Sequence, residues 1–97
     1  MGELSQPRVI AAMPAYNEEN YIGTMVLKTK QYVDEVIVVD DGSTDKTSEV
    51  ARLAGATVVQ HGRNKGYGAA IQSIFAEARK RKPEILVLLD ADAQHDP

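Results

Sequence analysis

The sequence predicts an α/β fold of three layers, in which helices cover both faces of a mainly parallel sheet. Two observations predict this architecture. Short, nearly continuous apolar runs alternate along the chain with segments of helical periodicity, and such runs are typical of parallel strands buried on both faces. The connections are also long enough for right-handed crossovers. With 97 residues, of which 43% are hydrophobic and 26% charged, the chain is expected to form one domain over residues 1–97.

Four segments are predicted to be strands. The first covers residues 8–13, which are rich in β-branched and apolar side chains, and it is expected to stop at Pro14. Residues 35–39 and 84–89 are nearly continuous apolar runs, and residues 56–60 form a weaker one. All four have the length of a strand in a small sheet.

Three segments between these strands are predicted to be helices. The longest has apolar residues at i, i+3, i+4 and i+7, which are Ile71, Ile74, Phe75 and Ala78. A shorter apolar stripe is made by Ile22, Met25 and Val26. The remaining helix covers roughly residues 45–54 and closes at Gly55, because glycine best tolerates the left-handed turn after a helix. The basic residues 79–82 are interpreted as a solvated helix end.

The composition argues against several classes of protein. The formal net charge of −3 does not favour a nucleic-acid surface, because phosphate binding needs clustered Lys and Arg. The absence of cysteine excludes disulfides and thiolate metal sites. The N-terminus does not resemble a signal peptide, and no apolar run approaches the ~20 residues of a membrane span, so a cytoplasmic location is expected.

A loop rich in polar residues or glycine follows each predicted strand. In a parallel sheet these loops all lie at the carboxyl edge, where open α/β folds bind their ligands. We therefore expect the chemistry of this chain to be concentrated at one edge of the sheet. The loops cover residues 14–19, 40–45, 61–66 and 90–95.

In the last loop, the run D-A-D-A-Q places oxygen-bearing side chains at alternate positions. In an extended segment Asp90, Asp92 and Gln94 lie on one side and can bind one cation. Oxygen ligands without cysteine favour Mg²⁺ or Mn²⁺. The alternative is that these acids only end a strand at the surface. The position after a buried strand, together with the three other loops, favours the metal.

The loop D-D-G-S-T-D follows another buried strand. A carboxylate there can accept hydrogen bonds from a base or a ribose, and Gly42 allows backbone to approach closely. Asp41, and with less support Asp40, is therefore a candidate ligand-binding residue. A turn and a helix cap account for Ser43, Thr44 and Asp45.

The loop P-A-Y-N-E-E has two interpretations that weigh about equally. Helix capping alone accounts for it, with Asn17 as the N-cap and two acids in the first turn. Alternatively, Pro14 and Tyr16 provide a fixed backbone and a flat ring that flank a base.

The segment N-K-G-Y-G-A-A-I enters the longest helix with two glycines and Lys65. A helix N-terminus with a nearby cation suits a diphosphate, although close packing of helix on strand also explains the glycines. The dinucleotide fingerprint and the P-loop are absent, since Ile71 stands where G-x-G-x-x-G needs glycine and no G-K-[ST] follows. His61 and His95 lack the spacing of zinc ligands, and we assign them surface or structural roles.

Taken in order, the stretches P-A-Y-N-E-E, V-V-D-D-G-S-T-D, N-K-G-Y-G-A-A and L-D-A-D-A-Q-H-D-P resemble glycosyltransferase family 2. They look most like its dolichyl-phosphate (polyprenyl-phosphate) mannosyl- and glucosyltransferases, and the resemblance covers residues 8–97. It implies the Rossmann-like, nucleotide-binding half of a GT-A fold with the strand order 3-2-1-4. It also implies an inverting transferase with a UDP- or GDP-linked sugar, Mg²⁺ or Mn²⁺, and a lipid-phosphate or saccharide acceptor.

The resemblance further implies roles for individual residues. The donor nucleotide would be bound by Pro14, Tyr16, Glu18, Asp41 and Lys65. Asp41 would meet the base or ribose, and Lys65 would lie toward the diphosphate. The metal ligands would be Asp90, Asp92 and Gln94. No general base is assigned, because the acceptor site and a carboxylate base are expected beyond Pro97, where Asp96 and Pro97 begin a further helix.

The implied strand order makes residues 84–89 an edge strand, so self-association through this strand is expected. Membrane association of the full-length protein is a further expectation. Two other functions stay open. One is a fragment that binds nucleotide and metal without turnover. The other is a sugar-1-phosphate nucleotidyltransferase, which is less favoured because P-A-Y-N-E-E occupies the place of the glycine-rich loop of that class.

Overall fold

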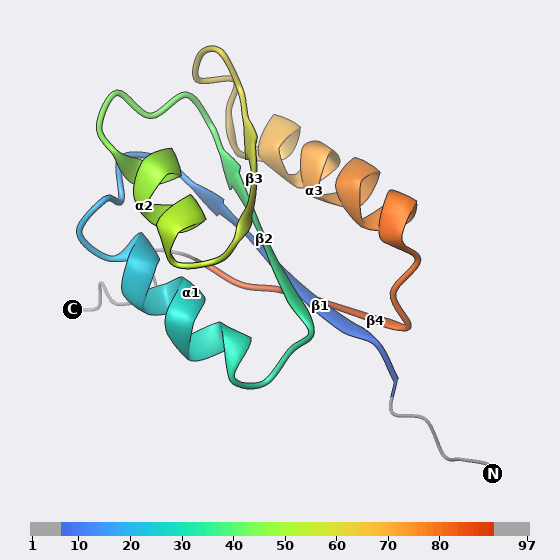
Figure 1. The fold of residues 1–97 in the computed structure, drawn as a ribbon. Helices are drawn as coiled ribbons and strands as arrows, with labels where there is room; N and C mark the ends of the chain where they lie inside the picture. The colour runs from blue at the N-terminus through green and yellow to red at the C-terminus, as the bar shows by residue number, and fades with distance from the viewer. Residues whose placement is uncertain (1–6, 91–97) are drawn as a thin grey trace, which may run out of the picture.

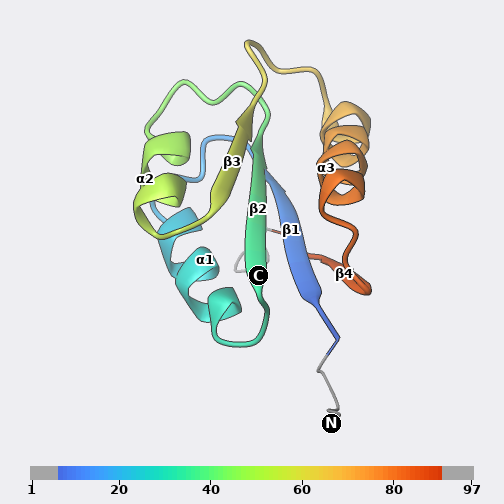
Figure 2. The same cartoon turned by 45° about the vertical axis from the view of Figure 1, so that its right-hand side comes forward.

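The computed structural model describes residues 7–90 and confirms the predicted fold, with four parallel strands in the order β3-β2-β1-β4 (Figure 1). The strands are β1 (Val9–Ala15), β2 (Glu35–Asp40), β3 (Thr57–Gln60) and β4 (Ile85–Leu88). The helices are α1 (Ile22–Lys30), α2 (Thr47–Leu53) and α3 (Tyr67–Arg81). Figures 1 and 2 show α1 and α2 on one face of the sheet and α3 on the other, which gives the three layers.

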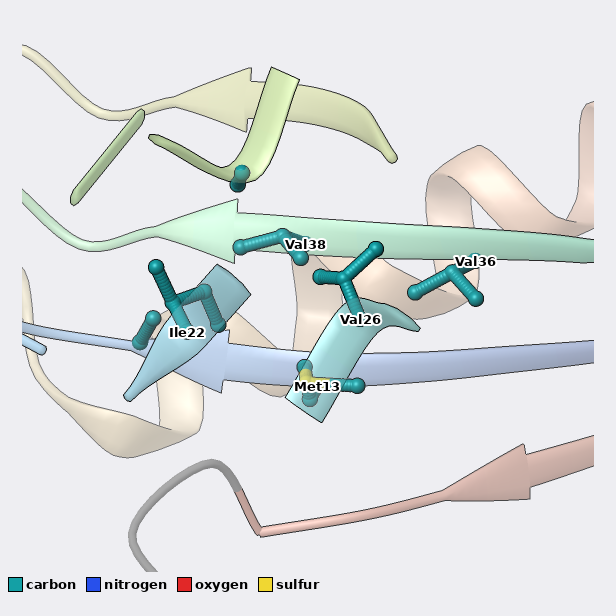
Figure 3. Close-up of a cluster of buried hydrophobic side chains, with 7 residues drawn as sticks. Met13, Ile22, Val26, Val36 and Val38 are labelled. Atoms are coloured by element: carbon teal, nitrogen blue, oxygen red, sulfur yellow. The ribbon is translucent and has the colours of Figure 1, made fainter. Parts of the chain in front are cut away.

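The hydrophobic core has two layers, because alternate residues of a strand point to opposite faces of the sheet. On the side of α1 and α2, Met13, Val36 and Val38 pack with Ile22 and Val26 (Figure 3). On the side of α3, the buried residues are Ile10, Ala12, Ile37, Val39, Ala70 and Ile74. Each fully buried Val or Ile side chain contributes about 1.5–3 kcal/mol. The apolar runs therefore lie in strands covered on both faces, as predicted.

Strand β1 does not stop at Pro14, contrary to the prediction, but continues to Ala15, with Pro14 opposite Val39 of β2. The reason lies in the direction of the backbone groups. The Ala12 carbonyl points toward β4 and accepts from the Leu89 N–H at 2.9 Å. Because every second residue of a strand points its backbone groups to the same neighbour, the backbone nitrogen of Pro14 also points to the side of β4, past the last paired residue of that strand. The missing N–H of proline therefore breaks no bond of the ladder. The Ala15 carbonyl still accepts from the Asp41 N–H at 2.9 Å.

The helix ends follow the predicted signals in part. Asp45 lies one residue before Lys46, the N-cap of α2, and its Oδ1 accepts from the Thr47 N–H at 2.9 Å, while Gly55 follows the helix with a φ of 105°. Asn17 is not the N-cap of α1, because that helix begins at Ile22. The predicted helix start at Asp96 and Pro97 lies outside the described residues. Over residues 7–90, no helix has both the length and the apolar character needed to cross a membrane.

The apolar stripe of α3 is buried only in part. Ile74 is fully buried and Ala78 is 4% exposed, as predicted, but Phe75 is 43% exposed. The cause is the position of α3, which packs mainly against β1 and β2. Strand β4 is an edge strand of this sheet, and its Ile85 and Leu88 are each 44% exposed.

Candidate functional site

A cavity of about 430 Å³ lies at the carboxyl edge of the sheet. Its walls come from all four loops that the sequence predicted to meet there. They include Pro14 at the end of β1, Tyr16 and Glu18 after it, Asp41 after β2, Asn64 and Gly66 after β3, and Asp90 after β4. Tyr67 and Ala70 of α3 complete the lining. The parallel arrangement of the strands brings these residues together, because it places the ends of all four strands on one edge.

The predicted binding residues are distributed unevenly around this cavity. Pro14, Tyr16, Glu18, Asp41 and Asp90 line it. Lys65 is exposed and is not part of the lining, although its neighbours Asn64 and Gly66 are. Asp92, Gln94 and His95 lie outside the described residues.

The loops after β1 and β2 are held together by reciprocal hydrogen bonds. The Asn17 N–H donates to Ser43 Oγ at 2.8 Å, and the Thr44 N–H donates back to Asn17 Oδ1 at 2.8 Å. Asn17 has a φ of 52°, a left-handed conformation that asparagine tolerates better than most residues. The side chain of Asn17 therefore joins two loops instead of capping α1.

The two acids that follow Asn17 extend this connection toward α2. The Glu18 N–H donates to Thr47 Oγ1 at 2.8 Å. The Glu19 N–H donates to Asp45 Oδ2 at 3.3 Å, and Glu19 Oε1 accepts from the Lys46 N–H at 2.9 Å. These bonds fix the backbone on which Tyr16 and Glu18 face the cavity.

Asp40 serves the fold. It is 2% exposed, its Oδ1 accepts from the Ser43 N–H at 2.9 Å, and its Oδ2 accepts from the Ser48 hydroxyl. Both oxygens are thus bonded to the loop after β2 and to α2. A buried carboxylate is stable only when its oxygens have such partners.

Asp41 is also buried, at 5% exposure, but it reaches the cavity. Its Oδ1 accepts from the Lys65 N–H at 2.8 Å and bonds His61 Nδ1 at 2.7 Å, and its Oδ2 accepts from the Gly66 N–H at 2.8 Å. Burial by itself raises the pKa of the Asp41 carboxyl, but the hydrogen bonds from His61, Lys65 and Gly66 together hold that pKa below its ordinary value. Asp41 is therefore a carboxylate that can only accept hydrogen bonds.

Residues 10–97 match the sequence model of a family described as Glycosyl transferase family 2. The chain belongs to this family. It is 40% identical over its whole length to an uncharacterised protein of Methanocaldococcus jannaschii, of which it covers 40%. It is 33% identical to the UDP-N-acetylglucosamine–dolichyl-phosphate N-acetylglucosaminyltransferase of Methanococcus voltae, with 88% of this chain and 41% of that protein covered.

A third relative is the undecaprenyl-phosphate 4-deoxy-4-formamido-L-arabinose transferase of Edwardsiella ictaluri, which is 34% identical over 92% of this chain and 30% of that protein. Among solved structures, glucosyl-3-phosphoglycerate synthase of Mycobacterium tuberculosis, in complex with Mn²⁺, UDP and glucosyl-3-phosphoglycerate, has a TM-score of 0.74 and 30% identity. The match covers 88% of this chain and 33% of that one. The chain thus spans less than half the length of these relatives.

The oxygen-bearing side chains of the cavity suit the divalent metal ions, Mn²⁺ and Mg²⁺, found in similar solved structures. Glu18, Asp41 and Asp90 place carboxylates around it, and oxygen donors are the ligands of Mg²⁺ and Mn²⁺. Both carboxylate oxygens of Asp41 are bonded within the protein. Within residues 7–90, no three His, Cys, Asp or Glu side chains gather closely enough to hold a metal by themselves.

Sequence reasoning missed two polar residues that line the cavity, Asn64 and Tyr67. Tyr67 begins α3 and is 69% exposed, and it shares the cavity with Tyr16, which is 46% exposed. The side-chain amide of Asn64 donates to the Asp41 carbonyl at 3.3 Å. Both residues stand in the stretch N-K-G-Y-G, which the sequence had already marked as a ligand loop, but nothing local indicates which side chains of that loop face inward.

Proposed function

We propose that this chain forms the donor-binding part of a glycosyltransferase, which binds a nucleotide-diphosphate sugar with a divalent metal for inverting transfer to an acceptor. The observation that carries the proposal is that all four loops meet in one cavity. Its walls carry two aromatic rings and three acidic side chains, which are Tyr16, Tyr67, Glu18, Asp41 and Asp90. Relatives that carry UDP in their names or complexes make UDP-linked sugars the first donors to test.

Each part of the cavity suits one part of such a donor. The rings of Tyr16 and Tyr67 offer flat surfaces to a base. Asp41, as an acceptor, suits a ring N–H or a ribose hydroxyl. The start of α3 and the exposed Lys65 provide the positive partial charge and the cation that favour a diphosphate.

A bound Mg²⁺ or Mn²⁺ would stabilise the negative charge of the departing nucleoside diphosphate. Asp90 is the described residue that we assign to the metal, and Asp92 and Gln94 are its proposed partners. We assign no general base within residues 7–90, because we assign the acidic side chains of the cavity to binding of the nucleotide sugar and the metal.

Lipid phosphate is the acceptor class that we favour over a saccharide. Two relatives of this chain are named for dolichyl phosphate and undecaprenyl phosphate. An acceptor of that kind would bring the full-length protein to a membrane surface. The similarity to glucosyl-3-phosphoglycerate synthase supports instead a small, soluble phosphorylated acceptor. A transfer assay that compares a lipid phosphate with a soluble phosphorylated acceptor distinguishes the two.

Nucleotide binding tests the proposal directly. We expect UDP with Mn²⁺ to raise the melting temperature of the chain, because a ligand that binds only the native state at 100 times its Kd adds about 2.7 kcal/mol of stability. GDP, ADP and Mn²⁺ alone serve as comparisons. No shift with any nucleotide would contradict the proposal. Binding without release of nucleotide from a UDP-sugar in the presence of acceptor would favour the alternative of a binding fragment.

The metal assignment has its own test. Asp90→Asn is expected to remove most of the Mn²⁺-dependent part of the UDP stabilisation, because the neutral amide is a weaker ligand than a carboxylate. Glu49→Gln is the matched control, since Glu49 is an exposed acid on α2 that does not line the cavity. Equal Mn²⁺ dependence in the two variants would contradict a metal role for Asp90. Incubation with UTP and a sugar 1-phosphate tests the nucleotidyltransferase alternative, and pyrophosphate release would support it.

A further inference from the structure

Three side chains from separate parts of the chain form a hydrogen-bonded row behind the cavity. Ser73 Oγ on α3 lies 2.8 Å from His61 Nε2, and His61 Nδ1 lies 2.7 Å from Asp41 Oδ1. The side chains of His61 and Asp41 are each 7% exposed. His61 follows β3 directly, and its N–H donates to the Asp40 carbonyl at 2.9 Å. The imidazole is thus fixed at its backbone and at both ring nitrogens.

The chemistry of Asp41 determines how the hydrogens are arranged in this row. A carboxylate can only accept, so His61 Nδ1 must carry the hydrogen of the bond between them. In a neutral imidazole Nε2 is then the acceptor, and the Ser73 hydroxyl donates to it. One tautomer and one ring orientation satisfy both contacts.

The order serine, histidine, carboxylate is also that of a nucleophilic triad. The surroundings argue against that function here. Neither His61 nor Ser73 lines the cavity, and the imidazole is almost completely covered. Ser73 Oγ is therefore not presented to the cavity, so the row faces the protein and not a substrate.

We propose that His61, supported by Ser73, is a positioning residue that fixes the Asp41 carboxylate and through it the Lys65–Gly66 backbone at the cavity wall. Oδ1 of Asp41 receives His61 and the Lys65 N–H, and Oδ2 receives the Gly66 N–H. Three of the about four acceptor places of a carboxylate are thereby filled within the protein. Gly66, with a φ of 100°, leads directly into α3, so the same bonds set where that helix begins.

The experiment compares three variants, and its binding readout rests on the proposed function. His61→Leu removes both ring contacts. His61→Asn keeps a donor near the position of Nδ1 but cannot reach Ser73. Ser73→Ala removes only the outer contact. Gln72→Ala, at an exposed neighbouring position on α3, is the matched control.

We expect His61→Leu to weaken UDP binding about tenfold or more, or about 1.4 kcal/mol, because the variant loses a hydrogen bond to a charged group. His61→Asn is expected to recover most of this loss, Ser73→Ala to lose about twofold to fivefold, and Gln72→Ala to bind like the wild type. A merely space-filling role predicts no recovery by asparagine, so equal affinities of His61→Asn and His61→Leu would overturn the inference.

A second readout needs no ligand. Hydrogen exchange of the Lys65 and Gly66 amides, measured by NMR on the free chain, is expected to be about tenfold faster than in the wild type for His61→Leu and about twofold to fivefold faster for Ser73→Ala, with His61→Asn close to the wild type. If the wild type binds no nucleotide, the proposed function fails and exchange alone decides the inference. If His61→Leu does not fold, Ser73→Ala and His61→Asn decide it. Unchanged exchange in the folded variants overturns it.

Discussion

Gly42 is the residue at which two loops of the cavity touch. Its φ is 81°, and a Cβ built on it would lie 2.3 Å from the Arg63 carbonyl carbon and the Asn64 nitrogen. The sequence had suggested that Gly42 lets backbone approach a ligand. The structure shows that it lets the loop after β3 approach the loop after β2, and this contact positions Asn64 beside Asp41.

Gly42→Ala is expected to lower the free energy of unfolding by about 2 kcal/mol or more, because left-handed backbone and overlap with a main chain are both unfavourable. Urea unfolding measures this change. Gly68→Ala is the matched control, since a Cβ at Gly68, in the first turn of α3, meets no atom within 4 Å. That variant is expected to keep or slightly raise stability. Similar losses in both variants would contradict the role given to Gly42.

The lowered pKa of Asp41 makes the stability of the fold depend on acid. A carboxyl whose pKa is lower in the folded chain stabilises it above the unfolded-state pKa of 3.8, and this contribution disappears as the pH falls through the folded-state pKa. Asp45 and Glu77 also have lowered pKa values. Burial raises the pKa of Asp45, but its hydrogen bonds, those with Thr47 first and that with the Glu19 backbone next, together outweigh the burial. Hydrogen bonds from Arg81 and then Lys80 lower that of Glu77.

We therefore expect the melting temperature to fall steeply as the pH decreases below about 4. Asp41→Asn is expected to be less stable at pH 7, because its amide group cannot replace both oxygens as acceptors, and to show a shallower decline in acid. Melting curves from pH 7 to pH 2 measure both effects. Parallel curves for the wild type and Asp41→Asn would show that Asp41 does not carry this dependence.

At the scale of elements, the loop after β1 and the start of α2 behave as one unit. Side chains of one loop bond the backbone of the other in both directions, through Asn17, Ser43, Asp45 and Thr47. None of these bonds depends on a ligand. They explain why the stretches P-A-Y-N-E-E and D-D-G-S-T-D occur together, since each supplies partners that the other lacks.

Replacement of Asn17 tests this unit. Asn17→Gly removes the bond to the Thr44 N–H and is expected to lower stability by about 1 kcal/mol. Asn17→Ala is expected to lose about 1 kcal/mol more, because alanine is strained at the φ of 52° found there. Asn20→Ala, in the exposed turn before α1, serves as the control. Denaturant unfolding measures the series, and equal stabilities of the alanine and glycine variants would contradict the strain.

At the scale of the whole molecule, the two ends of the sheet are held differently. The carboxyl edge carries the cavity, whereas at the opposite edge Glu35 bonds Arg8 at 3.1 Å and Arg81 at 2.8 Å. Arg81 also pairs with Glu77 at 2.6 Å. The sequence suggested that the basic end of α3 is solvated. The structure shows that it is only partly so, because Arg81 pairs with Glu35 of β2. This network ties α3 to β2 without using any residue of the cavity.

Strand β4 forms the edge of the described sheet next to β1, and self-association through it stays a prediction. Leu88→Lys is expected to reduce association, because a charge on an edge strand disfavours pairing with a second copy. Leu53→Lys is the control, since Leu53 is 83% exposed on α2, away from β4. Sedimentation velocity over a range of concentrations measures both variants. A wild type that is monomeric at high concentration would contradict the prediction.

The sequence by itself determined the type and order of the elements, the parallel sheet, and the edge at which polar loops gather. These properties follow from apolar periodicity and from the chain direction, both of which can be read from short stretches of sequence. The family resemblance supplied the strand order. Only the tertiary structure decided which polar residues of those loops serve the fold. Asp40, Asn17 and Asp41 look alike in the sequence as candidate ligand or cap residues. Yet Asn17 bonds Ser43, 26 residues away along the chain, and Asp41 bonds Lys65, 24 residues away. Such partners are brought into reach only when the strands align, so no local pattern could show that Asp40 bonds within the fold while Asp41 both holds a loop and lines the cavity.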